Sequence, residues 1–312
     1  LIVNEKEIFE LVDKVIKVMN EEKKGNLLKE TIGEIKSANM FRDGSVVYIP
    51  KTDETLYVVA DIHGDYISLK KVLEKIGLYE NMKSIHPNIK VVFLGDYIQK
   101  GLDSIGVLIE IMRLKIKYSD RVIILRGNND ARDKNKDIDV VLRLNKEALA
   151  QQEAIFKTFG HLKKSCFLSI ETEIKYGIEA GERIIEKFER FFEELPHMLI
   201  TGNAIALAHG APWHDSKFNL KDVAVNKDLI YELKHNSTWT DKYEPNEIYK
   251  ETNYKKYKIR EKGFFEVLNK IGARIFVGGH VSVKAGSIQF GGKMVVLHST
   301  DVYSPESGYY FY

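Results

Sequence analysis

Five short apolar segments of the chain each end in residues that can bind metal ions. Asp61 and His63 directly follow the run Leu56–Ala60. A carboxylate and an imidazole two positions apart can both turn toward a metal where a strand gives way to a loop. The other four runs end in Gly95-Asp96, Arg126-Gly127-Asn128-Asn129-Asp130, His209-Gly210 and Gly278-Gly279-His280. Each motif alone could be an ordinary turn, but five of them in one chain indicate a shared site.

The residue types predict the kind of site. Three histidines, two or three carboxylates and an asparagine are nitrogen and oxygen ligands that suit Mn, Fe or Zn, and they exclude a thiolate site. One carboxylate can bridge two cations, and Asp96, in the middle of the set, is the natural bridge. Two metals about 3.5–4 Å apart would hold a hydroxide for in-line attack on phosphorus. We therefore expect two divalent metal ions, with manganese favoured and iron or zinc as alternatives.

The elements around these motifs predict an α/β fold. Helical patterns at about Tyr66–Ile76 and Ser104–Lys117 separate the first three apolar runs, and each is long enough for a crossover between parallel strands. Ligands bind beyond the carboxyl ends of such strands, where these polar motifs lie. The strands are expected at Leu56–Ala60, Lys90–Leu94, Arg121–Leu125, Asn203–Ala208, Arg274–Val277, Lys293–His298 and Gly308–Tyr312.

Two further regions are predicted to be helical. Asn4–Asn20 carries an apolar stripe, and Asn4 and Glu7 are spaced as a capping pair. With a second stretch at Leu27–Ser37, this helix suggests an N-terminal helical cap of residues 1–45 ahead of a catalytic domain of residues 46–312. Residues from about 131 to 196 contain no clear strand, and we expect a helical insertion there that lies over the site.

Composition limits the partners. The chain has 312 residues with 47 basic and 45 acidic side chains, so its net charge of +2 offers no bulk attraction to nucleic acid or to an anionic membrane. It has no apolar run near 18 residues and no signal-peptide pattern, and its single cysteine fits a reducing compartment. We expect a cytoplasmic protein with no membrane or nucleic-acid partner. The oligomeric state stays open.

In order and spacing, the five motifs resemble the successive signatures of the phosphoprotein phosphatase branch of calcineurin-like metallophosphoesterases. The match runs from about residue 56 to residue 303 and includes Leu195-Pro196 and Trp239-Thr240-Asp241. The resemblance implies a four-layer α/β/β/α sandwich of two mixed sheets. It also implies hydrolysis of a phosphomonoester by a metal-bridging hydroxide, with a phosphoprotein or a small phosphoester as the substrate.

The resemblance also assigns roles to individual residues. The first metal would be held by Asp61, His63 and the bridging Asp96, and the second by Asp96, Asn128, His209 and His280. The substrate phosphate would be bound by Lys100, Arg260, Asn128, Asn129 and Tyr303. Asp96, Asn129 and Asp65 are the candidate catalytic residues.

Two positions depart from the family pattern. Gly127-Asn128-Asn129-Asp130 stands where the family has Gly-Asn-His followed by Glu or Asp, so Asn129 replaces the histidine that protonates the leaving group. Gln99 replaces the aspartate that orients this histidine. An amide cannot donate a proton as an acid, and the loss of a general acid typically costs about 10²–10⁴-fold in rate. Poor leaving groups such as a serine alkoxide should suffer most.

Three explanations of the two amides stay open. The chain could be an engineered inactive form. It could be a natural enzyme that uses good leaving groups or another acid such as His214 or His298, which is the explanation we favour. It could also bind phosphorylated ligands without turning them over. One alternative function is therefore a non-catalytic phospho-ligand-binding module. The other is hydrolysis of dinucleoside polyphosphates or phosphodiesters, since relatives with these activities also have Asp in place of Glu at the position of Asp130.

Overall fold

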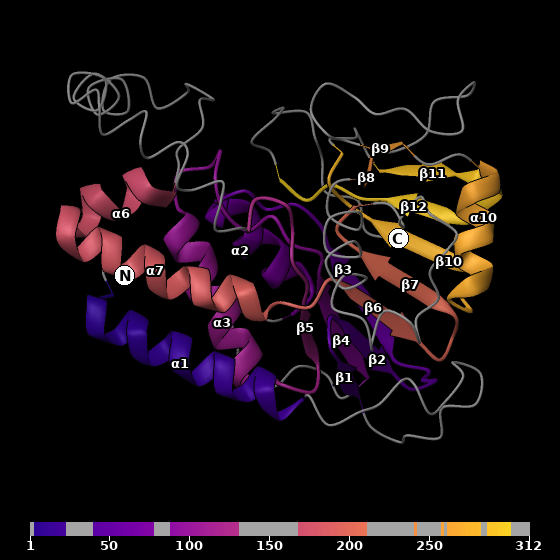
Figure 1. Cartoon of the computed structure of the whole chain (residues 1–312), viewed down its shortest axis with the longest axis horizontal. Coiled ribbons are helices and arrows are strands. Elements are labelled where there is room, and N and C mark those ends of the chain that lie inside the picture. The colour runs from indigo at the N-terminus through magenta and orange to yellow at the C-terminus, as the bar shows by residue number, and fades with distance from the viewer. Residues whose placement is uncertain are drawn as a thin grey trace.

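The protein folds into four layers. The computed structural model describes residues 3–22, 40–77, 88–130, 168–210, 240–241, 257–258, 261–281 and 286–300. Two β-sheets pack face to face between two layers of helices, so the order across the molecule is α/β/β/α (Figure 1). This is the architecture that the sequence resemblance predicts.

The smaller sheet is parallel throughout its three strands. It consists of β3 (Thr55–Val59), β4 (Ile89–Phe93) and β5 (Val122–Ile124), in that order. Helix α2 (Tyr66–Lys75) lies between β3 and β4 in the chain, and α3 (Ser104–Lys117) lies between β4 and β5. The predicted βαβ units are therefore confirmed. All three strands point their carboxyl ends, and the motifs that follow them, at one edge of the sheet.

The larger sheet has seven strands of mixed direction. Strands β7 (Ile205–Ala208) and β10 (Ile275–Gly278) are parallel neighbours. Strand β10 also pairs in parallel with β12 (Met294–Val296), whereas β6 (Met198–Thr201) runs antiparallel to β7. The separate strands β8 (Thr240–Asp241) and β9 (Tyr257–Lys258) pair with each other. The order in the large sheet is β1 (Phe41–Asp43), β2 (Val46–Ile49), β6 (Met198–Thr201), β7 (Ile205–Ala208), β10 (Ile275–Gly278), β12 (Met294–Val296) and β11 (Ser287–Gln289), with the 3-10 turn η2 (Phe290–Gly292) after β11.

Successive side chains of a strand point to opposite faces of its sheet, so a separate hydrophobic core fills the space between each pair of neighbouring layers. In β4, Val91 and Phe93 face the helices, while Val92 and the following Leu94 face the other sheet. Side chains of β2 alternate in the same way between the two sheets' shared core and the core under α10 (Glu261–Lys270). Each sheet is thus buried on both faces, which explains the nearly continuous apolar runs in the sequence.

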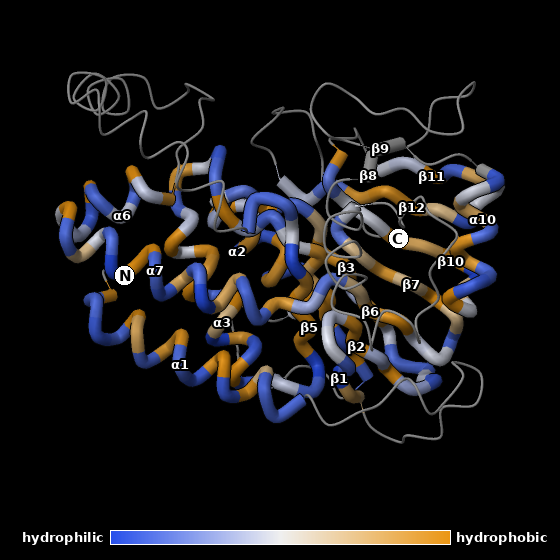
Figure 2. Tube along the Cα trace, in the orientation of Figure 1, coloured by the Kyte–Doolittle hydropathy of each residue, from blue (hydrophilic) through white to orange (hydrophobic). Residues whose placement is uncertain are grey.

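The other outer layer consists of α1 (Glu5–Glu21), α6 (Leu168–Tyr176) and α7 (Ile178–Glu194), packed around α2 and α3. Helix α1 begins with the predicted capping box, in which Asn4 and Glu7 exchange side-chain and backbone hydrogen bonds. Its apolar stripe faces inward and its polar face outward, as the alternating colours of Figure 2 show. Helices α6 and α7 lie within the predicted helical insertion.

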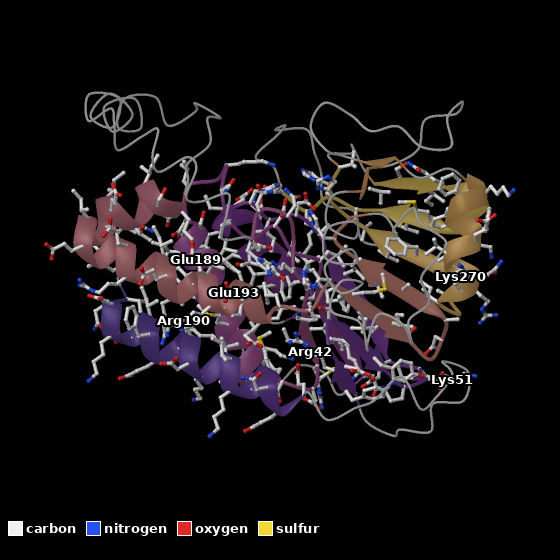
Figure 3. The ribbon with its side chains drawn as sticks, in the orientation of Figure 1. Arg42, Lys51, Glu189, Arg190, Glu193 and Lys270 are labelled. Atoms are coloured by element: carbon white, nitrogen blue, oxygen red, sulfur yellow. The ribbon has the colours of Figure 1, made fainter. Side chains whose placement is uncertain are left out.

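Helix α1 shares its hydrophobic core with α3 and α7. Its C-terminal end is also tied to strand β1, because the backbone N–H of Arg42 donates to the carbonyl oxygen of Glu22 at 2.9 Å. The guanidinium of Arg42, which is labelled in Figure 3, donates to the carbonyl oxygen of Glu194 at the end of α7, at 2.6 Å. The domain boundary predicted between residues 45 and 46 stays a prediction, but α1 and β1 before it pack against elements that follow it.

Several expectations differ from the structure or lie beyond its described part. Sequence patterns do not predict β1, β2, β6 and β11, whose three or four residues are too few to show a period. They also do not predict α10, a helix of ten residues. The second cap helix at Leu27–Ser37 and the strand at Gly308–Tyr312 lie outside the described residues. None of the helices in the described ranges is long and apolar enough to cross a membrane.

Candidate metal centre

The predicted motifs converge where the ends of β3, β4 and β5 face the ends of β7 and β10. Hydrogen bonds join the two sheets at this edge. The backbone N–H of His280, after β10, donates to Oδ1 of Asp61, after β3, at 2.8 Å. The backbone N–H of Arg126, after β5, donates to the carbonyl oxygen of Pro196, just before β6, at 2.8 Å. Donors from both sheets are thereby brought within reach of one another.

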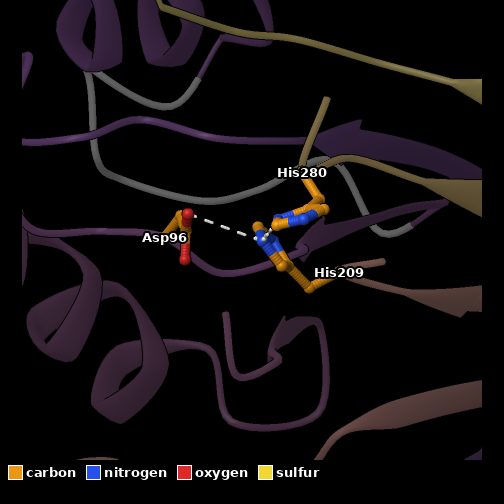
Figure 4. A group of neighbouring side chains, drawn as sticks. All are labelled: Asp96, His209 and His280. Carbon is orange, nitrogen blue, oxygen red and sulfur yellow. Dashed lines mark hydrogen bonds and ion pairs between the residues drawn. The ribbon is translucent and has the colours of Figure 1, made fainter. Parts of the chain in front are cut away.

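One group of donors consists of Asp96, Asn128, His209 and His280. Oδ1 of Asn128 lies 3.0 Å from Nε2 of His209 and 2.7 Å from Nδ1 of His280. The two imidazole nitrogens are 3.2 Å apart, and Oδ2 of Asp96 is 3.5 Å from Nε2 of His209. Figure 4 shows the rings of His209 and His280 next to each other, with the carboxylate of Asp96 facing them.

A second group consists of Asp61, His63 and the same Asp96. Nε2 of His63 lies 3.6 Å from Oδ2 of Asp61 and 3.5 Å from Oδ2 of Asp96. All three residues are buried. The two groups therefore share one carboxylate, as the sequence predicts for a bridging Asp96.

These donor atoms fit two divalent cations. Ligand atoms of a tetrahedral site with bonds of about 2.1 Å lie roughly 3.4 Å apart, and most of the separations above are close to that value. The set combines imidazole nitrogens with carboxylate and amide oxygens and contains no sulfur. The family-derived ligand set therefore has the spacing that a metal pair requires.

The backbone aims the His63 ring at the first group. Nδ1 of His63 is 3.1 Å from the carbonyl oxygen of Ile98, which acts as the acceptor of the Nδ1 proton. Nε2 then carries the lone pair and points at the two carboxylates. His63, Asp96 and His280 all have positive φ angles, of 50°, 56° and 67°. Such conformations cost free energy in residues other than glycine and cluster at functional sites.

Asp130 holds the loop that carries Asp96. Its fully buried carboxylate accepts three backbone hydrogen bonds, from Asp96 at 2.7 Å, Gly127 at 2.9 Å and Tyr97 at 3.0 Å. A Cβ on Gly127 would lie 2.1 Å from the backbone nitrogen of Asp96, so only glycine permits this approach. Sequence reasoning gave Asp130 no role, although its place at the end of the Gly-Asn-Asn-Asp motif is a usable signal.

The electrostatics of the site favour cations. Burial alone would raise the pKa of Asp61, but the nearby imidazoles of His209 and His63 outweigh it and hold that pKa below its ordinary value. The same balance lowers the pKa of Asp96. Burial, together with the Asp96 carboxylate, raises the pKa of Asp130 to about 7. Burial also lowers the pKa of His209 and so favours the neutral imidazole, the form that binds a metal.

The other predicted site residues are placed as follows. Nζ of Lys100 lies 2.8 Å from Nε2 of His63, at the edge of the first group. The backbone N–H of Asn129 donates to Oδ1 of Asp96 at 2.8 Å, and its side-chain amide donates to Oδ2. Asp65 accepts from the backbone of Ser68 at the start of α2, and from the hydroxyl of Thr300 at 3.0 Å. The catalytic role suggested for Asp65 stays a prediction.

Some predicted residues cannot be placed. Arg260, Tyr303 and His214 lie outside the described residues. His298 lies near enough to Asp61 to contribute to the lowering of that carboxyl's pKa. The roles predicted for all four therefore stay predictions.

Comparison with known proteins identifies the family. The model of the calcineurin-like phosphoesterase family matches residues 55–284, which contain all six predicted metal ligands. The chain belongs to this family. Members of this family use divalent metal ions. The two donor groups described above are therefore candidates for the metal site of such a phosphoesterase.

Individual relatives agree with this family. The Caenorhabditis elegans protein named "Putative serine/threonine-protein phosphatase C06A1.3" is 31% identical over 141 residues, which are 41% of this chain and 35% of that protein. The chain thus matches about a third of that relative's length. A Saccharomyces cerevisiae protein serine/threonine phosphatase similar to human PP5 superposes with a TM-score of 0.67 at 17% identity, covering 96% of this chain and 78% of the other. A cold-active protein tyrosine phosphatase superposes with a TM-score of 0.52 at 16% identity, covering 86% and 75%. The two superpositions show a shared fold.

Proposed function

We propose that this calcineurin-like phosphoesterase hydrolyses phosphomonoesters with two divalent metal ions and with weak protonation of the leaving group. The observation that carries the proposal is the pair of donor groups that meet at Asp96. Asp61 and His63 would hold one cation, and Asn128, His209 and His280 the other. When bound, the two cations would activate a water molecule for attack on phosphorus and offset the charge that builds on the phosphoryl oxygens.

The remaining residues of the site position the substrate. The ammonium of Lys100 lies 2.8 Å from Nε2 of His63, within hydrogen-bond distance. A cation bound to that nitrogen would displace the ammonium, which could then bind a phosphate oxygen as a point charge. Asn129 donates to both carboxylate oxygens of Asp96. It therefore fixes the orientation of the shared carboxylate, and its amide supplies no proton to a leaving group.

Weak protonation restricts the substrates. In aryl phosphates the leaving group is good and departs without protonation, whereas a serine alkoxide needs a proton to depart. The similar proteins are named as serine/threonine and tyrosine phosphatases, which supports a phosphomonoester, including one on a protein, as the substrate class. A cytoplasmic location, manganese as the metal and the phosphate-binding roles of Arg260 and Tyr303 belong to the same proposal.

The test compares two substrates in the presence of manganese. We expect hydrolysis of p-nitrophenyl phosphate by the wild type, much slower hydrolysis of a phosphoserine peptide, and close to two bound metal ions per chain by elemental analysis. Asp96→Asn should lose both metal binding and hydrolysis, because it weakens both groups at once. Equal rates on the two substrates would show that another residue supplies the proton. A wild type that binds no divalent metal would refute the proposal.

A further inference from the structure

The loop that carries Lys100 has a conformation that its own residues do not favour. Gln99 and Lys100 both have φ angles of 69°, in the left-handed region. Two consecutive residues other than glycine in this region must be held there by their surroundings. The contacts around this loop therefore decide where the Lys100 ammonium lies.

On one side the loop is held against the turn of the first metal group. The backbone N–H of Gly101 donates to the carbonyl oxygen of His63 at 2.6 Å, and that of Asp103 donates to the carbonyl oxygen of Gly64 at 3.0 Å. A Cβ on Gly101 would lie 2.3 Å from the carbonyl oxygen of His63, so the two backbones are in direct contact. Any shift of this loop therefore moves Lys100 relative to His63.

On the other side the loop is held by the start of α3. The backbone N–H of Gln99 donates to Oγ of Ser104, the first residue of that helix, at 3.2 Å. Asp103 is the N-cap and accepts from the backbone N–H of Gly106 at 3.1 Å. The N-terminus of α3 therefore fixes the position of the Gln99–Lys100 segment.

That fixed point is itself held from the helical insertion. Glu171 of α6 is buried, and its carboxylate accepts from the backbone N–H of Ser104 at 2.8 Å and from that of Ile105 at 3.1 Å. Lys175, one turn later in α6, donates to Glu171 and to Asp103, both at 2.8 Å. A negative side chain at a helix N-terminus stabilises the exposed N–H groups and the helix dipole. Glu171 thus caps α3 from 67 residues away.

From these contacts we infer that Glu171 is a positioning residue for phosphate binding, through which the helical insertion sets the place of Lys100. Glu171 accepts a hydrogen bond from the backbone of Ser104, and the Ser104 hydroxyl accepts one from the backbone of Gln99. The next residue, Lys100, extends its ammonium to His63 of the first group. Glu171 touches none of the predicted metal ligands in the contacts described, so its effect should fall on substrate affinity and leave metal binding intact. This inference rests on the proposed role of Lys100 in binding phosphate.

The test is a double-mutant cycle that measures binding of inorganic phosphate to the manganese-loaded protein by calorimetry. Glu171→Gln should weaken phosphate binding roughly fivefold or more, because the amide loses one of the acceptor oxygens that hold the helix. It should raise KM for p-nitrophenyl phosphate by a similar factor and change kcat and metal content little. In a Lys100→Ala background, Glu171→Gln should have no further effect on phosphate binding, because the group that it positions is gone.

Thr172→Val is the matched control. Thr172 is the next residue of α6, is also buried, and uses its hydroxyl within its own helix, at Leu168 and Ser169. The substitution should lower stability without changing phosphate affinity. If Glu171→Gln weakens binding equally in both backgrounds, the inference is overturned and the role of Lys100 stands. If Lys100→Ala leaves phosphate binding unchanged, the role of Lys100 falls and the inference falls with it.

Discussion

At the scale of single residues, three consecutive polar side chains perform three different tasks. Oδ1 of Asn128 faces the two histidines of the second group. The amide of Asn129 donates to Asp96. The carboxylate of Asp130 accepts backbone hydrogen bonds from Asp96 and from Gly127, and so joins the loop after β4 to the loop after β5. Asn129, in the middle, therefore stabilises a negative charge at the position where the sequence resemblance predicts a proton donor. The chemistry of this site should accordingly depend on the leaving group.

Replacing Asn129 by histidine tests this dependence. In the Asn129→His, Gln99→Asp double variant, an imidazole oriented by a carboxylate should protonate the leaving group. We expect kcat/KM for a phosphoserine peptide to rise by at least about tenfold relative to that for p-nitrophenyl phosphate. Asn129→Gln, which keeps the amide, should leave this ratio unchanged. An unaltered ratio in the double variant would mean that protonation does not limit hydrolysis.

The sequence predicted which donor residues meet at the site better than it predicted the contacts around them. Asp61, Asp96 and His209 could be predicted because each lies just after an apolar run, and strand ends in an α/β fold meet at one edge. The contact between Asn129 and Asp96 could not be predicted, since a loop with a positive φ turns its side chains in directions that spacing does not encode. The cap that Glu171 supplies to α3 was missed for a related reason, because it spans 67 residues.

At the scale of elements, the long patterns were predictable, whereas the short strands were predictable only in part. Helix α1 shows a complete apolar stripe and a capping box, and β4 contains the apolar run that follows Lys90. Strands β1, β6 and β11 have only three or four residues. Such strands are stabilised by the partners with which they pair, and these partners lie far away in the sequence, so local composition carries little signal.

We expect the packing of helix α1 to contribute to the stability of the whole domain. Ile8, with no exposed surface, belongs to the cluster that contains Leu108 of α3 and Phe188 of α7. Ile8→Ala should therefore lower the free energy of unfolding by about 2–5 kcal/mol in urea titrations. The exposed Lys14→Ala on the same helix should change it by less than about 0.5 kcal/mol. A loss near zero for Ile8→Ala, or a separate unfolding transition of α1, would instead favour an independent N-terminal cap.

At the scale of the whole molecule, the site lies across the two sheets. Asp61, Asp96 and Asn128 follow strands of the three-stranded sheet, and His209 and His280 follow strands of the seven-stranded sheet. A cation held by the second group would therefore connect the two sheets at the edge where their strand ends meet. Metal binding should accordingly stabilise the complete fold and not only the loops of the site.

Thermal unfolding with and without manganese measures this connection. A cation that binds only the folded protein stabilises it by about 2.7 kcal/mol per site when its free concentration is 100 times Kd, so the Tm of the wild type should rise by several degrees and fall again with EDTA. His209→Ala removes a donor from the second group only and should show a smaller rise, with about one metal ion bound per chain. Asp96→Asn weakens both groups and should show almost none. If manganese raised the Tm of Asp96→Asn as much as that of the wild type, the stabilising cations would bind elsewhere, and the two groups at Asp96 would not be the metal centre.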